Sequence, residues 1–297
     1  MSLVINHNMM AMNAARNLSQ SYGNLSVSTR RLSSGLRVGT AADDAAGLAI
    51  RELMRADIAS INQGMRNAND AISMIQTADG ALQVIDEKLI RMKELAEQAA
   101  TGTYTSDQRL IIDSEYQAMA SEITRIANAT DFNGIYLLNG NLSADQFTGS
   151  GLQSSGKLKV HFGAGNDSAE DYYYIQIGNS TASALGVGNQ SVPGTDGYSI
   201  STQEAAQSSL DAINNAIVSK DKIRASLGAL QNRLENTITN LSIQAENLQA
   251  AESRISDVDV AQEMTEFVRN QILTQSAVAM LAQANQLPQM AMQLMQG

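Results

Sequence analysis

The residues that could do chemistry in this chain are few and scattered. The two histidines, His7 and His161, lie far apart, and neither has the spaced His, Cys or acidic partners of a metal site. Asp43-Asp44 could act as an acid and a base, but adjacent acids ahead of an apolar run are typical of a helix start. Ser33-Ser34-Gly35 lacks the flanking pattern of a nucleophile turn and indicates a hinge. We therefore predict no catalytic residue, no metal, no cofactor and no enzyme activity.

The elements that hold these residues are mostly long helices. Between residues 58 and 99 apolar side chains recur at steps of three and four, which predicts one long helix from about Thr40 to Ala100. Its heptad seam slips once near Asp79. Thr40 and Asp43 have the spacing of a helix cap, so we expect the helix to begin there.

Four more helices are expected on either side. The first runs from Ile5 to about Leu32, and a second heptad seam predicts a helix from about 202 to 255. The last runs from Val260 to Met295, where Pro288 should kink or loosen the final turns. A helix from Ser106 to Asn128 should pack through its apolar residues, which are Leu110, Ile111, Tyr116, Met119, Ile123 and Ile126.

A stretch rich in Gly, Ser and Asn separates the two halves, from about Phe132 to Thr202. Two β-rich runs, 157–162 and 172–177, flank a Gly/Asn/Asp turn and predict a hairpin. Neither heptad seam passes through residues 141–199, so we interpret this stretch as a small β-containing insert.

Composition excludes several classes of protein. The chain has 297 residues, a formal charge of −10, no Cys and no Trp. Absent cysteine rules out a disulfide framework and a thiolate metal site. The acidic balance argues against nucleic acid as a partner, and no apolar run is long enough for membrane insertion. The N-terminus also lacks the pattern of a secretory signal.

Together these patterns predict a mainly α fold: a long antiparallel helical coiled-coil rod with paired terminal helices and a small β-containing central insert. We expect boundaries at 1–40, 41–140, 141–200, 201–256 and 257–297. Both ends are apolar, poor in charge and rich in Asn and Gln, which is an unfavourable surface for a lone monomer. We therefore expect self-association through Ile5, Leu18, Leu25, Leu32, Leu36, Phe267, Ile272, Leu281, Leu287 and Leu294.

Several ordered motifs closely resemble bacterial flagellin. They are RLSSGLR at 31–37, DDAAGLAI at 43–50, RNAND at 66–70, FNG at 132–134, LGALQNR at 227–233 and LAQANQ at 281–286. The resemblance covers roughly residues 1–140 and 200–297. It implies export through the flagellar type III apparatus, a secreted, extracellular location and polymerisation into the flagellar filament that drives motility. It also implies filament cap and hook-associated proteins as partners.

Two further partners follow from this resemblance. An export chaperone is expected to bind the C-terminal helix at Ile272, Leu281, Gln283, Asn285 and Leu287. The segment 89–98 resembles the flagellin stretch recognised by the vertebrate Toll-like flagellin receptor, with Arg91, Leu95 and Glu115 at matching positions. We expect Arg91 and Leu95, four residues apart, to share a helix face. Ile90 departs from the polar residue usual in receptor-activating flagellins.

Two alternatives stay open. A hook–filament junction protein shares the terminal helices, although the motifs at 43–50 and 281–286 favour flagellin. From another class, the insert could be an adhesin mounted on a filament.

Overall fold

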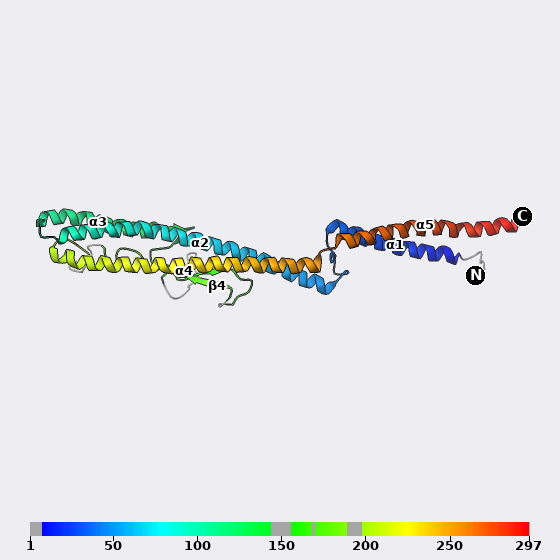
Figure 1. The fold of residues 1–297 in the computed structure, drawn as a ribbon, viewed down its shortest axis with the longest axis horizontal. Coiled ribbons are helices and arrows are strands. Elements are labelled where there is room, and N and C mark those ends of the chain that lie inside the picture. Colours follow the sequence, from blue (N-terminus) through cyan, green and yellow to red (C-terminus); the bar gives the residue numbers. More distant parts are fainter. Residues whose placement is uncertain (1–7, 144–155, 168–169, 189–197, 297) are drawn as a thin grey trace. The chain divides into compact units, whose positions relative to one another are not determined.

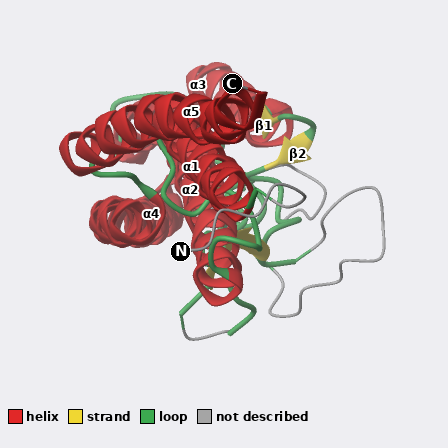
Figure 2. Ribbon diagram, turned by 90° about the vertical axis from the view of Figure 1, so that its right-hand side faces the viewer, coloured by secondary structure: helices red, strands yellow, loops and turns green. Residues whose placement is uncertain are grey.

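The structure, a computed structural model, describes residues 8–143, 156–167, 170–188 and 198–296, excluding the side chains of 287–289 and 291–296. Helices account for most of the chain, and the strands are short segments among loops (Figure 2). The predicted fold class, mainly α with a small β-containing part, is confirmed. The described helices are α1 (Met9–Ser34), α2 (Ala45–Ala100), α3 (Ser106–Ala129), α4 (Gln203–Ser256) and α5 (Val260–Gln296).

The start of α2 differs from the prediction. Asp43 accepts hydrogen bonds from the backbone N–H and the hydroxyl of Thr40, at 3.0 and 2.8 Å, and so closes a turn ahead of the helix. The capping role falls to Asp44, whose Oδ1 accepts a hydrogen bond from the Gly47 N–H at 2.9 Å. The helix therefore begins at Ala45 rather than at Thr40.

Two antiparallel hairpins make up the β structure. β1 (Asp131–Phe132) pairs with β2 (Ile135–Tyr136), and β3 (Leu158–His161) pairs with β4 (Tyr172–Ile175), which confirms the predicted hairpin. Asn133 and Gly134 both have positive φ, 52° and 80°, as a tight two-residue hairpin turn requires.

The chain divides into two compact units. The terminal unit comprises Met1–Ile58 and Glu246–Gly297, and the central unit comprises Ala59–Ala245. The division falls within α2 and α4, not at the ends of helices where the sequence suggested boundaries.

In the central unit α2 and α4 run antiparallel (Figure 1), as two ion pairs show. Arg224 Nε lies 2.7 Å from Asp79 Oδ1, and Lys220, only 1% exposed, pairs with Asp86. The heptad seam of α2 is confirmed: Leu82, Ile85, Leu89 and Met92 are all fully buried. Asp79, where the seam slips, is thus the partner of an arginine on the facing helix.

One predicted packing surface is wrong in part. Leu110 and Ile111, at the start of α3, are 56% and 70% exposed. The buried residues of α3 instead follow Ile112, Tyr116 and Ile123, a helical stripe that excludes the two preceding positions.

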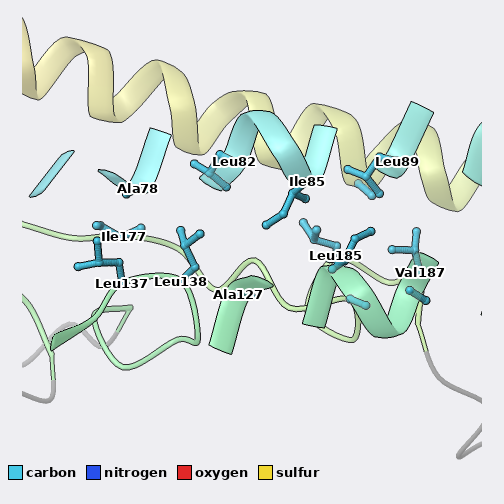
Figure 3. Packing of buried hydrophobic residues seen from close by; sticks show 14 of the residues in the cluster. Ala78, Leu82, Ile85, Leu89, Ala127, Leu137, Leu138, Ile177, Leu185 and Val187 are labelled. Atoms are coloured by element: carbon cyan, nitrogen blue, oxygen red, sulfur yellow. The ribbon is translucent and has the colours of Figure 1, made fainter. Parts of the chain in front are cut away.

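The described part of the predicted insert belongs to the core. Figure 3 shows Leu82 and Ile85 of α2 facing apolar side chains from the segments that follow α3 and β4. These partners are fully or almost fully buried: Leu137, Leu138, Ile177, Leu185 and Val187. Phe162, just after β3, lies so close to α2 that a Cβ at Gly64 would collide with its carbonyl. Leu137 and Leu138 precede the predicted insert, but Ile177, Leu185 and Val187 lie within it, so the interpretation of an insert outside the core is wrong for these three residues.

Candidate functional site

The terminal helices α1 and α5 pack against each other along a narrow seam. The inner seam is made of residues spaced alternately by three and four, each buried or half-buried. On α1 they are Ala11, Ala14, Leu18, Ser21, Leu25, Ser28 and Leu32; on α5 they are Glu263, Phe267, Asn270, Thr274, Ala277, Leu281 and Ala284. Nine of these fourteen residues are small or polar, and Ser28, Asn270 and Thr274 are 4–7% exposed.

Hydrogen bonds fasten the pair at both ends. At one end Asn8 caps α1 through the Ala11 N–H (3.0 Å), and its Nδ2 donates to the Ala284 carbonyl at 2.8 Å. At the other end Gly35 adopts the left-handed conformation that ends α1, with φ of 72°. Its carbonyl accepts a hydrogen bond from the Val258 N–H at 3.0 Å, so the turns after α1 and before α5 are joined by backbone.

Charged side chains gather at the turn after α1. Arg31 lies 3.7 Å from Asp43 and 3.6 Å from Glu263, and Arg30 lies 2.9 Å from Asp43. The hydrogen bond from the Thr40 hydroxyl, with help from both arginines, holds the pKa of Asp43 below its usual value. Arg51, 7% exposed, donates to the Val38 carbonyl at 2.6 Å. These contacts connect α1, the following turn and the start of α2 within the terminal unit.

Twelve large apolar side chains lie, among polar ones, on the side of the pair that faces away from the inner seam. We call these twelve residues the outer face; they are all 44–61% exposed. They are Met9, Met10, Met12 and Tyr22 on α1, and Val260, Met264, Val268, Ile272, Leu273, Val278, Met280 and Met290 on α5. No charged residue follows Arg269 in the sequence. The seam thus mixes small and polar residues with a few leucines and Phe267, while many large apolar side chains remain in solvent. Such exposure is typical of a surface that another molecule covers.

Most of the interface residues expected from sequence lie away from the outer face. Leu18, Leu25, Leu32, Phe267 and Leu281 line the inner seam, and Leu36 forms a backbone bridge with Asp257. Ile272, 56% exposed, is on the outer face. Ile5 and the side chains of Leu287 and Leu294 lie outside the described residues.

Sequence reasoning missed much of the outer face, including Met9, Met12, Tyr22 and Leu273. The available signal was the inner seam itself, because its small and polar residues have heptad spacing, which leaves the large apolar side chains on the opposite side.

The residues expected to bind a chaperone are only partly accessible. Ile272, Gln283 and Asn285 are exposed, whereas Leu281 is half-buried in the inner seam. The side chain of Leu287 lies outside the described residues.

The expected receptor patch changes in composition. Arg91 of α2 lies 2.8 Å from Glu115 of α3 and 3.0 Å from Glu94, and all three side chains are well exposed. The hydrogen bond to Glu115, followed by that to Glu94, raises the pKa of Arg91. Leu95 is only 2% exposed, so the expectation that it shares an open face with Arg91 is wrong. The packing of α3 beside α2 widens the buried stripe to include Leu95 as well as Ala96.

The described residues offer little that could support catalysis. They contain no group of three His, Cys, Asp or Glu side chains placed to hold a metal ion. His161 stacks on Tyr172 with ring centres 6.0 Å apart, and His7 lies outside the described residues. No helix in the described part of the chain is long and apolar enough to cross a membrane.

Comparison with known proteins identifies the family. Residues 5–143 match the profile described as "Bacterial flagellin N-terminal helical region", and residues 210–295 match "Bacterial flagellin C-terminal helical region". The chain belongs to the bacterial flagellin family. This is a family of structural proteins, and membership places the chain among structural filament subunits.

Full-length relatives support the same assignment. The flagellar filament 33 kDa core protein of Treponema phagedenis is 42% identical over 296 residues, covering 99% of this chain and 100% of its own length. A flagellin from Halalkalibacterium halodurans is 42% identical over 293 residues, with coverage of 99% and 100%.

A solved structure shows a similar fold. A candidate flagellar hook-associated protein from Vibrio parahaemolyticus superimposes with a TM-score of 0.54 over 72% of this chain and 100% of its own. At 16% identity this likeness concerns the fold alone. A Bacillus cereus flagellin is 28% identical, with coverage of 63% and 94% and a TM-score of 0.47.

Proposed function

We propose that this chain polymerises into the flagellar filament through the outer face of α1 and α5. The observation that carries the proposal is the exposure of large apolar residues such as Val268 and Ile272, while Asn270 and Thr274 are buried. Burial of each half-exposed apolar side chain stabilises a contact by roughly 1 kcal/mol. The part of the outer face on α1 and the part on α5 can contact different surfaces of neighbouring copies, as an open helical filament requires.

The introduction of charge on the outer face tests this function. Val268→Glu with Ile272→Glu places two carboxylates on the outer face without touching the inner seam. We expect a helical monomer that no longer elongates filament seeds. Light scattering and electron microscopy measure the elongation. The matched control is Val218→Glu on α4, which alters a valine that is 51% exposed in the central unit. Normal elongation by the double variant would overturn the proposal.

A second role is as a ligand of the vertebrate Toll-like flagellin receptor. It is supported by the exposed charges that Arg91 gathers from two helices, and Leu95 has no part in it. Arg91→Ala with Glu115→Ala should reduce receptor activation by the monomer. Glu122→Ala with Arg125→Ala is the control, because it removes another exposed ion pair of α3, 2.7 Å long. Equal activity of the two double variants would reject this role.

Chaperone binding belongs to the same proposal. An export chaperone that takes Leu281 together with Ile272 must compete with α1, because Leu281 faces the inner seam. We therefore expect the chaperone to hold α5 apart from α1 before export to the cell exterior. Binding of equal strength to a variant that lacks residues 260–297 would contradict this. Contacts with filament cap and hook-associated proteins are expected after export.

The two alternatives differ in what assembles. A hook–filament junction protein would add to hook ends without elongating filament seeds, so the elongation assay separates it from a filament subunit. An adhesin role would require binding by the segment from β3 to β4 in assembled filaments.

A further inference from the structure

Methionine exposure differs sharply between parts of the chain. Among methionines whose side chains are described, those of α1 and α5 are all 44–61% exposed: Met9, Met10, Met12, Met264, Met280 and Met290. In the central unit Met74 and Met92 are 2% and 0% exposed, and Met65 and Met119 are half-buried. The thioethers that solvent reaches are therefore concentrated on the outer face.

Three of these side chains gather around one hollow. Met9 and Met10 of α1 and Met280 of α5 line a surface depression of about 330 Å³, together with Asn13 and Asn17. A depression of this size admits small polar solutes, and flexible, unbranched thioethers expose their sulfur readily. The sulfur atoms at this end of the pair are open to a dissolved oxidant.

We propose that the six exposed methionines are a modification site at which peroxide controls assembly. The thioether sulfur attacks one peroxide oxygen, the O–O bond breaks and an S–O bond forms. The other oxygen leaves as hydroxide and becomes water by taking the proton of the oxygen now bonded to sulfur. Sulfur is thus oxidised by two electrons and peroxide is reduced by two. The product, methionine sulfoxide, is polar and can be reduced enzymatically. This inference rests on the proposed function, because the outer face matters only if neighbouring copies cover it.

Oxidation acts on assembly by changing the outer face from apolar to polar. A sulfoxide oxygen that is buried without a donor should weaken a subunit contact about tenfold. Asn13 and Asn17 beside the depression can donate to a sulfoxide, so the cost applies to sulfoxides that a neighbouring copy covers with apolar side chains. The effect applies to unassembled chains, since neighbours in a filament shield the same sulfur atoms.

The first experiment maps and measures oxidation in the full chain. Monomers and filaments are exposed to equal doses of hydrogen peroxide, and sulfoxide is located by peptide mass spectrometry. We expect the six outer methionines of the monomer to react before Met74 and Met92, and to be protected in filaments. Seed elongation should fall about tenfold or more for oxidised monomer, and methionine sulfoxide reductases should restore it. Unchanged elongation by monomer with oxidised outer methionines would overturn the inference.

Matched variants assign the effect to these residues. A variant with leucine at positions 9, 10, 12, 264, 280 and 290 should elongate seeds equally before and after peroxide. Met74→Leu with Met92→Leu is the control and should stay as sensitive as the unaltered chain. If the six-leucine variant does not assemble, recovery of the oxidised unaltered chain by the reductases decides.

Equal peroxide sensitivity of the six-leucine variant would also reject the inference. Loss of elongation in the Val268→Glu, Ile272→Glu variant without any oxidation effect would leave the proposed function standing. Normal elongation by that variant would instead reject the proposed function itself.

Discussion

The terminal pair and the central unit are both antiparallel helix pairings with heptad seams, yet the terminal seam buries far more small and polar side chains. In the central unit Leu82, Ile85 and Leu89 are fully buried. In the terminal pair Ser28 and Asn270 occupy the seam while large apolar side chains lie outside. Periodicity therefore determines that two helices pair. Composition determines whether the pairing alone buries their apolar side chains.

The stabilities of the two pairings differ because they bury different amounts of apolar surface area. Full burial of a large aliphatic side chain contributes about 1.5–3 kcal/mol, whereas a small or polar seam residue contributes much less. Helices gain most of their stability in proteins from packing of an apolar face rather than from intrinsic propensity. The central unit contains its apolar partners within the chain, whereas in the proposed function the terminal pair finds them in neighbouring copies.

The largest expected effect comes from removal of one member of the terminal pair. Deletion of residues 260–297 should abolish filament elongation completely, because eight of the twelve residues of the outer face are lost. The thermal unfolding of the central unit should be unchanged, since its core lies within Ala59–Ala245. Circular dichroism and seeded elongation measure the two outcomes. Filaments of normal appearance from the truncated chain would break the comparison.

A matched pair of alanine substitutions sharpens the contrast at single residues. Ile177, in the segment after β4, is fully buried, and Ile272 is 56% exposed. Ile177→Ala should lower the free energy of unfolding by about 2–4 kcal/mol through lost transfer energy and a cavity. Ile272→Ala should cost the monomer less than about 0.5 kcal/mol and reduce elongation instead. Urea denaturation with the elongation assay separates these effects, and equal stability losses would contradict it.

A smaller effect is expected from the ion pair between α2 and α4. The hydrogen bond from Arg224 is the main cause that lowers the pKa of Asp79 below 3.8. A carboxyl with a depressed folded-state pKa stabilises the protein above its unfolded pKa and loses this contribution as the pH falls. Since both side chains are about one third exposed, the contribution is under about 1 kcal/mol.

Asp79→Asn tests this contribution directly. The difference in unfolding free energy between the unaltered chain and the variant should be constant near pH 7 and shrink below about pH 4. A difference that grows with acidity would show that the sign is wrong.

The smallest effect is expected at the start of α3. Ile111, 70% exposed, should tolerate replacement by Ser with a change in stability within about 0.5 kcal/mol. Ile112→Ser, at the adjacent buried position, provides the contrast and should be clearly destabilising. A large loss for Ile111→Ser would mean that the helix stripe is wrongly placed.

The sequence predicted the long helices well because a heptad pattern is a local property. Ile85 and Leu227 could be assigned to seams from spacing alone, and both are buried. The widening of the α2 seam to Leu95 could not be predicted, because it depends on which face α3 covers. The core residues after β4 were missed for a related reason: in Gly- and Ser-rich sequence no period indicates that Ile177 and Val187 turn inward.

The outer face was only half predictable. Low charge and apolar content showed that the ends need a partner, and this follows from composition. Which residues face outward depends on the register of α1 against α5. Residues such as Leu18 and Leu25 look like interface residues by type, yet α5 already covers them.

The hydrogen bond between Asn8 and the Ala284 carbonyl joins residues 276 positions apart. During synthesis α1 emerges first and its partner last, so nearly the whole chain must leave the ribosome before the two helices can meet. The central unit needs nothing beyond Ala245 and can fold earlier. The order of synthesis thus sets the order in which the two units can form, and the complete outer face is the last part of the molecule to form.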